Sequence, residues 1–163
     1  MRRRRYLSTL ATGTVVATAG CAGGKVVHAV QQTINVRPGR GWIDELPASA
    51  NKIRFIARDE QPFDVYVFTN PDNVEYYMTH LDGETPQQSP PGDSSLSGRA
   101  NRMANGVYQI ATEQKGRQDL AGEGPTFFVV DHSGYRDETV PEEFEEELSV
   151  TLDLEAVRST LPL

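Results

Sequence analysis

Cysteine is almost absent from this sequence: Cys21 is the one cysteine among 163 residues. A single cysteine excludes an internal disulfide, so burial of apolar side chains has to stabilise the fold. It also excludes a blue-copper centre, which needs a cysteine thiolate and two histidines within the folded strands, because Cys21 precedes every expected strand. His28, His80 and His132 are the only histidines. Their scattered positions predict no zinc or copper site and no cofactor.

Long hydrophobic runs are missing too. The apolar stretch near the start, residues 7–19, is shorter than the about 20 residues that a membrane-spanning helix needs. It follows four consecutive arginines, Arg2 to Arg5, and leads through small residues to Cys21. A basic segment, a short apolar segment and a small-residue cleavage site are the three parts of an export signal. We therefore predict that residues 1–21 are an export signal.

Two shorter motifs within this signal resemble known export and lipidation signals. The first resembles the twin-arginine export motif and comprises Arg3, Arg4, Tyr6 and Leu7. The second, Thr18-Ala19-Gly20-Cys21, resembles a lipobox, with Thr18 where leucine is common. This resemblance implies a diacylglycerol on the Cys21 thiol and a protein anchored in the cell membrane, facing outside. The alternative is a plain cleaved signal beside an incidental cysteine.

Lysine is scarce as well, because only Lys25, Lys52 and Lys115 follow the signal. The chain has 16 Lys+Arg and 23 Asp+Glu, and removing the signal takes away four arginines and no acid, which leaves 12 − 23 = −11. Such a surface stays soluble where salt screens its self-repulsion, and it resembles the surfaces of proteins from salt-loving archaea. An ordinary acidic protein is the alternative. The charge argues against nucleic-acid binding, which needs clustered basic residues.

Strand signals dominate the rest of the chain. Val26, His28, Val30, Ile34 and Val36 are expected to share one face of a first strand. Further strands are expected at 52–58, 62–69, 106–112, 125–131 and 147–154, and residues 41–47 form a further short element, which carries the only tryptophan. The stretch at 125–131 is apolar on both faces, as in a central strand, whereas 147–154 alternates. About seven strands without helical crossovers predict an antiparallel β-sandwich of the jelly-roll type.

One helix and one long loop interrupt the strands. Asn70-Pro71-Asp72 supplies a cap and a proline for a helix that ends at Asp82-Gly83. The stretch 83–105 is rich in proline, serine, glycine and asparagine, and we predict a long mobile surface loop there. The resulting division is a signal at 1–21, an N-terminal strand and connection at 22–50, the main sandwich at 51–158 and a tail at 159–163.

A strand, a helix with paired aromatics and a later apolar strand follow one another in this chain. They are Val65-Tyr66-Val67-Phe68, Tyr76-Tyr77 and the stretch from Gly124 to Asp131. The pattern resembles small GOLD-like jelly-roll sandwiches of exported prokaryotic proteins over roughly residues 50 to 154. It departs from them at His132, where asparagine is usual, and in the long loop. The resemblance implies an extracytoplasmic interaction or accessory module with a protein partner and no catalytic residues.

The stretch Asp131-His132-Ser133 contains the residue types of a hydrolase relay. Consecutive strand residues point to opposite faces, so we expect no relay among these three, and the sequence has no GxSxG elbow. Asp131, Ser133, Asp137 and Glu138 offer oxygens to calcium but lack the spacing of an EF-hand loop. A solvated turn is therefore predicted. A small hydrolytic or metal-dependent enzyme using His132 stays open as an alternative.

Two further surface features have a structural explanation. The acidic run at 141–149 is expected to be a solvated strand edge. Four aromatics are expected in the core rather than on a carbohydrate-binding face, and these are Tyr66, Phe68, Tyr76 and Tyr77. About 140 residues are few for a two-lobed solute-binding protein, which is the other alternative. We predict a lipid-anchored, non-enzymatic protein with a binding or structural role.

Overall fold

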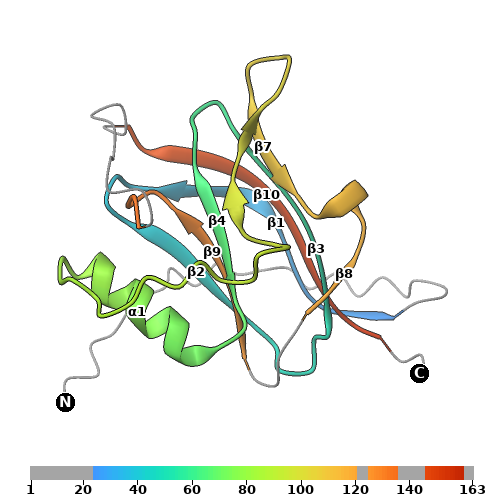
Figure 1. Cartoon of the computed structure of the whole chain (residues 1–163). Helices are drawn as coiled ribbons and strands as arrows, with labels where there is room; N and C mark the ends of the chain where they lie inside the picture. Colours follow the sequence, from blue (N-terminus) through green and yellow to red (C-terminus); the bar gives the residue numbers. More distant parts are fainter. Residues whose placement is uncertain (1–23, 121–124, 136–145, 160–163) are drawn as a thin grey trace.

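The chain folds as two antiparallel β-sheets packed face to face, with one helix on the outside (Figure 1). The computed structural model describes residues 24–120, 125–135 and 146–159. The predicted antiparallel sandwich with one helix is confirmed. The described residues form ten strands rather than about seven, because β5 (Gly98–Arg99), β6 (Asn101–Arg102) and β8 (Gln118–Asp119) are two-residue strands without a readable alternation. Within the described residues, no helix is long and apolar enough to span a bilayer.

Each sheet combines strands from distant parts of the chain. Sheet A runs in the order β1 (Lys25–Val36), β10 (Leu148–Arg158), β3 (Lys52–Asp59), β7 (Tyr108–Ala111) and β6 (Asn101–Arg102), and β8 (Gln118–Asp119) also pairs with β3. Sheet B runs in the order β2 (Gly41–Leu46), β9 (Thr126–Asp131), β4 (Asp64–Phe68) and β5 (Gly98–Arg99). A short 3-10 helix, η1 (Glu113–Lys115), separates β7 from β8.

The main core lies between the two sheets. β10 alternates as predicted, with Leu152 buried and Thr151 exposed, because successive strand residues face opposite sides. β9 is the central strand that its two apolar faces predict, since it pairs with both β2 and β4. The rings of Phe55 in sheet A and Phe128 in sheet B meet edge to face, with centroids 4.9 Å apart. Burial of these inner faces is the main stabilising term of the fold.

The first strand, β1, departs from its predicted single face. Its register with β10 shifts between Val26 and His28, which is a β-bulge. Val30 and Ile34 lie in the core between the sheets, as expected. His28, in contrast, stays partly exposed and bonds across to Asp44 of β2.

The helix α1 (Pro71–Leu81) begins and ends where the sequence predicts. Asn70 Oδ1 accepts a hydrogen bond from the Asp72 N–H at 2.9 Å, which satisfies a free donor of the first turn. The helix covers the outer face of sheet B (Figure 1). A second apolar cluster forms there, and its buried members are Tyr66, Phe68, Val74, Tyr77, Val129 and Tyr135. Three of the four aromatics predicted as core are therefore confirmed, whereas Tyr76 stays partly exposed.

The segment 83–105, predicted to be a mobile loop, is fastened to sheet B and crosses to sheet A. The Asp93 N–H donates to Val67 O at 2.8 Å, and the Val67 N–H donates to Ser97 Oγ at 2.9 Å. The chain then pairs with β4 through β5 and with β7 through β6, with Ala100 buried between them. The sequence does not reveal these contacts because the buried apolar residues, Leu96 and Ala100, are isolated.

Candidate functional site

A group of buried and half-buried polar side chains lies where β9 ends, and we call it the Asp131 cluster: Tyr77, His80, Asp131 and Ser133. Asp131 is only 2% exposed. Its Oδ1 accepts hydrogen bonds from the Tyr77 hydroxyl at 2.7 Å and from the hydroxyl and backbone N–H of Ser133. Its Oδ2 accepts from the Tyr135 N–H at 3.4 Å. Both carboxylate oxygens therefore face donors from the chain itself.

Two local features bring these residues together. Asp131 is the last residue of β9, and the chain turns back through Gly134 at a φ of 65°, so the Tyr135 N–H can return to Asp131. Tyr77 reaches Asp131 by passing over Gly41 of β2. A Cβ atom on Gly41 would overlap the Tyr77 hydroxyl. The glycine therefore leaves the space through which α1 is bonded to the end of β9.

Burial controls the protonation of both groups. It raises the pKa of Asp131 from its ordinary value of 3.8, while the hydrogen bonds from Ser133 and Tyr77 act in the opposite direction. Burial also raises the pKa of Tyr77 well above its ordinary value of 10.0, and the nearby Asp131 carboxylate adds to this shift. The Tyr77 hydroxyl therefore stays protonated and donates a hydrogen bond to Asp131.

The order of hydrogen bonds in the cluster differs from a catalytic relay. His80 Nε2 lies 3.2 Å from Ser133 O and 3.1 Å from Ser133 Oγ. A carbonyl only accepts, so Nε2 carries the proton in this contact. The Ser133 hydroxyl in turn donates to Asp131. In a relay the histidine stands between serine and aspartate and accepts the serine proton. Here Ser133 lies between His80 and Asp131. His80 Nε2 carries a proton, so it has no free lone pair with which to accept the serine proton.

His132, the residue of the predicted hydrolytic alternative, lies apart from this cluster. It is 4% exposed, and its Nε2 donates to Glu146 O at 2.7 Å. Its backbone bonds to Gly39 and Arg40 of the turn before β2. Within residues 131–133, the His132 side chain does not lie between the other two, because it bonds Glu146. Asp131 and Ser133 bond each other directly, which the sequence argument did not foresee, because positions two apart can face the same side.

The candidate metal ligands do not converge in the described part of the chain. No group of three or more histidine, cysteine, aspartate or glutamate side chains there could hold a metal ion. His28 bonds Asp44, and His80 and His132 bond two different loops. Of the residues weighed as calcium ligands, Asp137 and Glu138 lie outside the described residues. Cys21, the export motif and most of the acidic run lie outside them as well.

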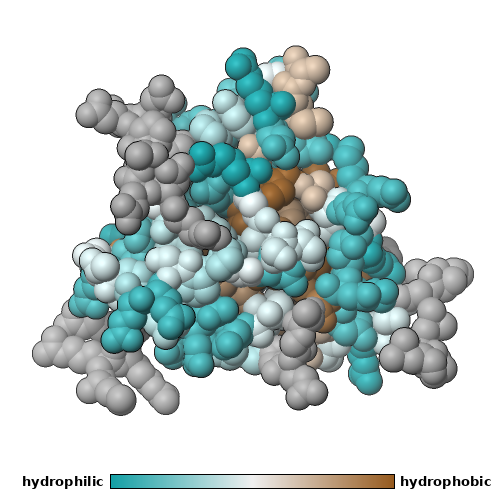
Figure 2. All heavy atoms as spheres, viewed as in Figure 1, coloured by the Kyte–Doolittle hydropathy of each residue, from teal (hydrophilic) through white to brown (hydrophobic). Residues whose placement is uncertain are grey.

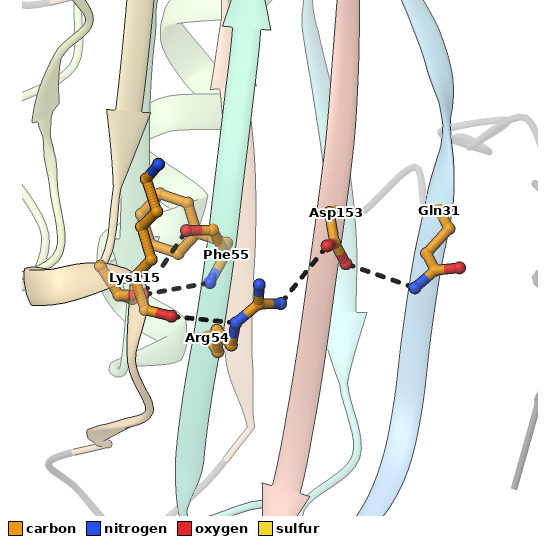
Figure 3. A network of polar contacts seen from close by, with 6 residues as sticks. Gln31, Arg54, Phe55, Lys115 and Asp153 are labelled. Carbon is orange, nitrogen blue, oxygen red and sulfur yellow. Dashed lines mark hydrogen bonds and ion pairs between the residues drawn. The ribbon is translucent and has the colours of Figure 1, made fainter. Parts of the chain in front are cut away.

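The outer face of sheet A carries a second polar network, which sequence reasoning missed (Figure 3). Arg54 on β3 donates from Nη1 to Asp153 Oδ2 at 3.3 Å and from Nε to Lys115 O at 3.0 Å. Gln31 on β1 donates to Asp153 Oδ1 at 3.5 Å. The alternation of β10 predicts that Asp153 faces outward. Its partners could not be predicted, because they are 99 and 122 residues away in the sequence.

An ion pair joins the edges of the two sheets. His28 Nε2 on β1 lies 2.7 Å from Asp44 Oδ2 on β2. The hydrogen bond to Asp44 raises the pKa of His28 above 6.5. Partial burial of His28 opposes this shift in pKa, and the negative charge of Asp44 adds to it. The pair therefore fastens β1 over β2 and neutralises the charge of Asp44 while His28 is protonated.

The surface is mostly hydrophilic. In the view of Figure 2, apolar residues gather in a narrow central zone that hydrophilic residues surround. Among the described residues, Met103 is the one large hydrophobic side chain that is exposed, at 44%. Comparison with protein-family models and with curated protein sequences yields no match. The function therefore has to be argued from the residues of this chain.

Proposed function

We propose that this chain is an exported, lipid-anchored β-sandwich protein on the outer face of the cell membrane, with a binding or structural role rather than a catalytic one. The observation that carries this proposal is the position of Cys21. It closes a signal-like segment, and β1 begins only four residues later, at Lys25. This position supports the proposal, because a lipidated cysteine would lie between the removed signal and the folded strands.

The short connection defines how such an anchor would hold the domain. Residues 22–24 separate Cys21 from β1, and the four steps of chain span at most about 14 Å when extended. Lys25 pairs with Arg158 near the end of β10, so this end of sheet A would lie next to the membrane. Two acyl chains, at about 0.8 kcal/mol for each buried methylene, would hold it there durably.

The hydrogen-bond geometry favours a binding or structural role. The Asp131 cluster uses its carboxylate oxygens and hydroxyls to fasten α1 to the end of β9, with a serine in the middle of the row. His132 is buried and fastens two loops. The GOLD-like pattern and the acidic, lysine-poor composition agree with an interaction module at the surface of a cell that lives in high salt.

Replacing Cys21 with serine tests the anchor. We expect the wild-type protein to stay with the membrane fraction after a high-salt wash and to enter the detergent phase in a detergent partition. Cys21→Ser removes the acylated thiol, so the variant should appear in the aqueous phase or the medium. Thr18→Leu is the matched control, because it brings the motif closer to a lipobox and should stay in the membrane. Retention of Cys21→Ser in the membrane fraction would refute the proposal.

A further inference from the structure

The strand β1 forms one edge of sheet A. It pairs with β10 on one side, and on the other side no strand formed by the described residues follows (Figure 3). Among the described residues, the backbone hydrogen bonds outside the strand ladders do not involve residues 25–36. An edge strand presents a row of backbone donors and acceptors that another strand can use.

Proteins usually protect such an edge, and β1 has little of this protection. Charged side chains, proline, bulges and shortness are the usual devices. Between Lys25 and Arg37 the sequence VVHAVQQTINV contains no proline and no charged residue apart from the titratable His28. Charged residues make up 24% of the chain, so eleven residues would hold two or three on average. The single bulge, at Val27, leaves His28 to Val36 in regular register.

Two carboxylates beside this edge have partners within the chain, whereas Glu155 of β10, opposite Ala29, is in no ion pair among the described residues. Asp153 on the neighbouring strand is bonded to Arg54 and Gln31, and Asp44 on β2 is paired with His28, whose pKa is raised. Two copies of a strongly acidic protein repel each other over most of their surfaces. The strand β1 itself adds no carboxylate to this edge, so a second copy is repelled less there than by the acidic parts of the surface.

We propose that β1 is a dimerisation strand: two copies of the chain pair β1 to β1, antiparallel, around a two-fold axis perpendicular to sheet A. Directly opposite residues of antiparallel strands face the same side, so the inner face of sheet A continues from one copy into the other. The exposed side chains of Gln31, Thr33 and Asn35 would meet their counterparts, and such polar pairs are favourable across strands.

The size of the edge is sufficient for a stable dimer. Nine regular residues, His28 to Val36, span about 30 Å at about 3.3 Å per residue. The two sheets, about 10 Å apart, and their outer side chains make the edge about 20 Å deep. The resulting contact of about 600 Å² per copy approaches the roughly 800 Å² per partner of standard interfaces. A two-fold contact of this kind closes on itself and ends at the dimer.

A lysine placed on β1 tests this proposal. Thr33 and Thr151 are opposite each other on β1 and β10, and both are exposed. Thr33→Lys brings two positive charges together near the two-fold axis, whereas Thr151→Lys makes the same change one strand away from the edge. We expect wild type and Thr151→Lys to sediment as dimers. Thr33→Lys should weaken the dimer about tenfold or more, without change in the circular dichroism spectrum.

Analytical ultracentrifugation of the protein purified from its host in detergent, at several salt concentrations, gives the readout. Salt should strengthen the dimer, because it screens the repulsion between the acidic bodies. A monomeric wild type at every salt concentration would overturn the proposal. Equal weakening by the two lysine variants would also overturn it, as would assemblies larger than a dimer. Hydrogen exchange adds an independent check, because amides on the free side of β1 should gain protection as the dimer forms.

Discussion

At the scale of the residue, one buried carboxylate holds together three parts of the chain. Asp131 accepts hydrogen bonds from the helix through Tyr77 and from the turn through Ser133 and Tyr135. A buried charge without such donors would be strongly unfavourable. The stability of this corner of the sandwich therefore depends on these donors as well as on the apolar contacts around them.

Removing one donor should destabilise the protein. Tyr77→Phe keeps the ring in the apolar cluster and deletes the hydroxyl that bonds Asp131. We expect the free energy of unfolding in urea to fall by about 1–3 kcal/mol, because a buried acceptor loses its partner. The pKa of Asp131 should rise further, since the Tyr77 bond lowers it. Tyr76→Phe, at a partly exposed position, is the control and should change stability by less than about 0.5 kcal/mol.

The glycine beneath Tyr77 can be tested separately. Gly41→Ala places a methyl group where the Tyr77 hydroxyl lies, and we expect a loss of about 1–3 kcal/mol from overpacking. Gly116→Ala is the control, because a methyl group there meets nothing closer than 3.6 Å. The double variant Gly41→Ala/Tyr77→Phe should lose less than the sum of the single losses. Strict additivity would contradict the contact.

The ion pair of His28 predicts a pH dependence. The folded-state pKa of His28 is raised above the ordinary value of 6.5. The stabilisation is therefore complete below about pH 6.5 and fades as the pH rises through the raised pKa. Asp44→Asn removes the cause of the shift, so the difference in unfolding free energy between wild type and Asp44→Asn should shrink across that range. A difference independent of pH would show that the pair does not act through the charge of His28.

At the scale of the element, features that depend on neighbouring residues can be predicted from the sequence, whereas features that depend on distant partners cannot. The alternation of β10 and the cap of α1 follow from neighbouring residues, so the sequence predicts the bounds of α1 and the start of β10, although β10 continues beyond the predicted residue 154 to Arg158. The pairing of β1 with β10, the bulge at Val27 and the two-residue strands depend on distant partners. The Asp131 cluster is of the same kind, because Tyr77 and Asp131 are 54 residues apart.

The cap of α1 gives a prediction at this scale. Asn70→Ala removes the side chain that bonds the Asp72 N–H, and the free energy of unfolding should fall by about 1 kcal/mol. Asn73→Ala makes the same chemical change inside the helix, where alanine is the better helix former, and should leave stability equal or slightly higher. Equal losses at both positions, measured by thermal or urea unfolding, would contradict the capping role.

At the scale of the whole molecule, we propose that the β-sandwich is anchored to a membrane through the sulfur atom of Cys21. The strand that begins beside the anchor, β1, is also the strand that we propose to pair with a second copy. The two proposals fail independently, because Cys21→Ser should release the protein from the membrane and leave its dimer intact. Thr33→Lys should do the reverse.

The mass of the N-terminal peptide of the native protein, extracted from membranes, tests the central proposal most directly. We expect a chain that begins at Cys21 and carries the mass of a diacylglycerol on that residue. A chain that retains residues 1–20, or one whose Cys21 is unmodified, would contradict it.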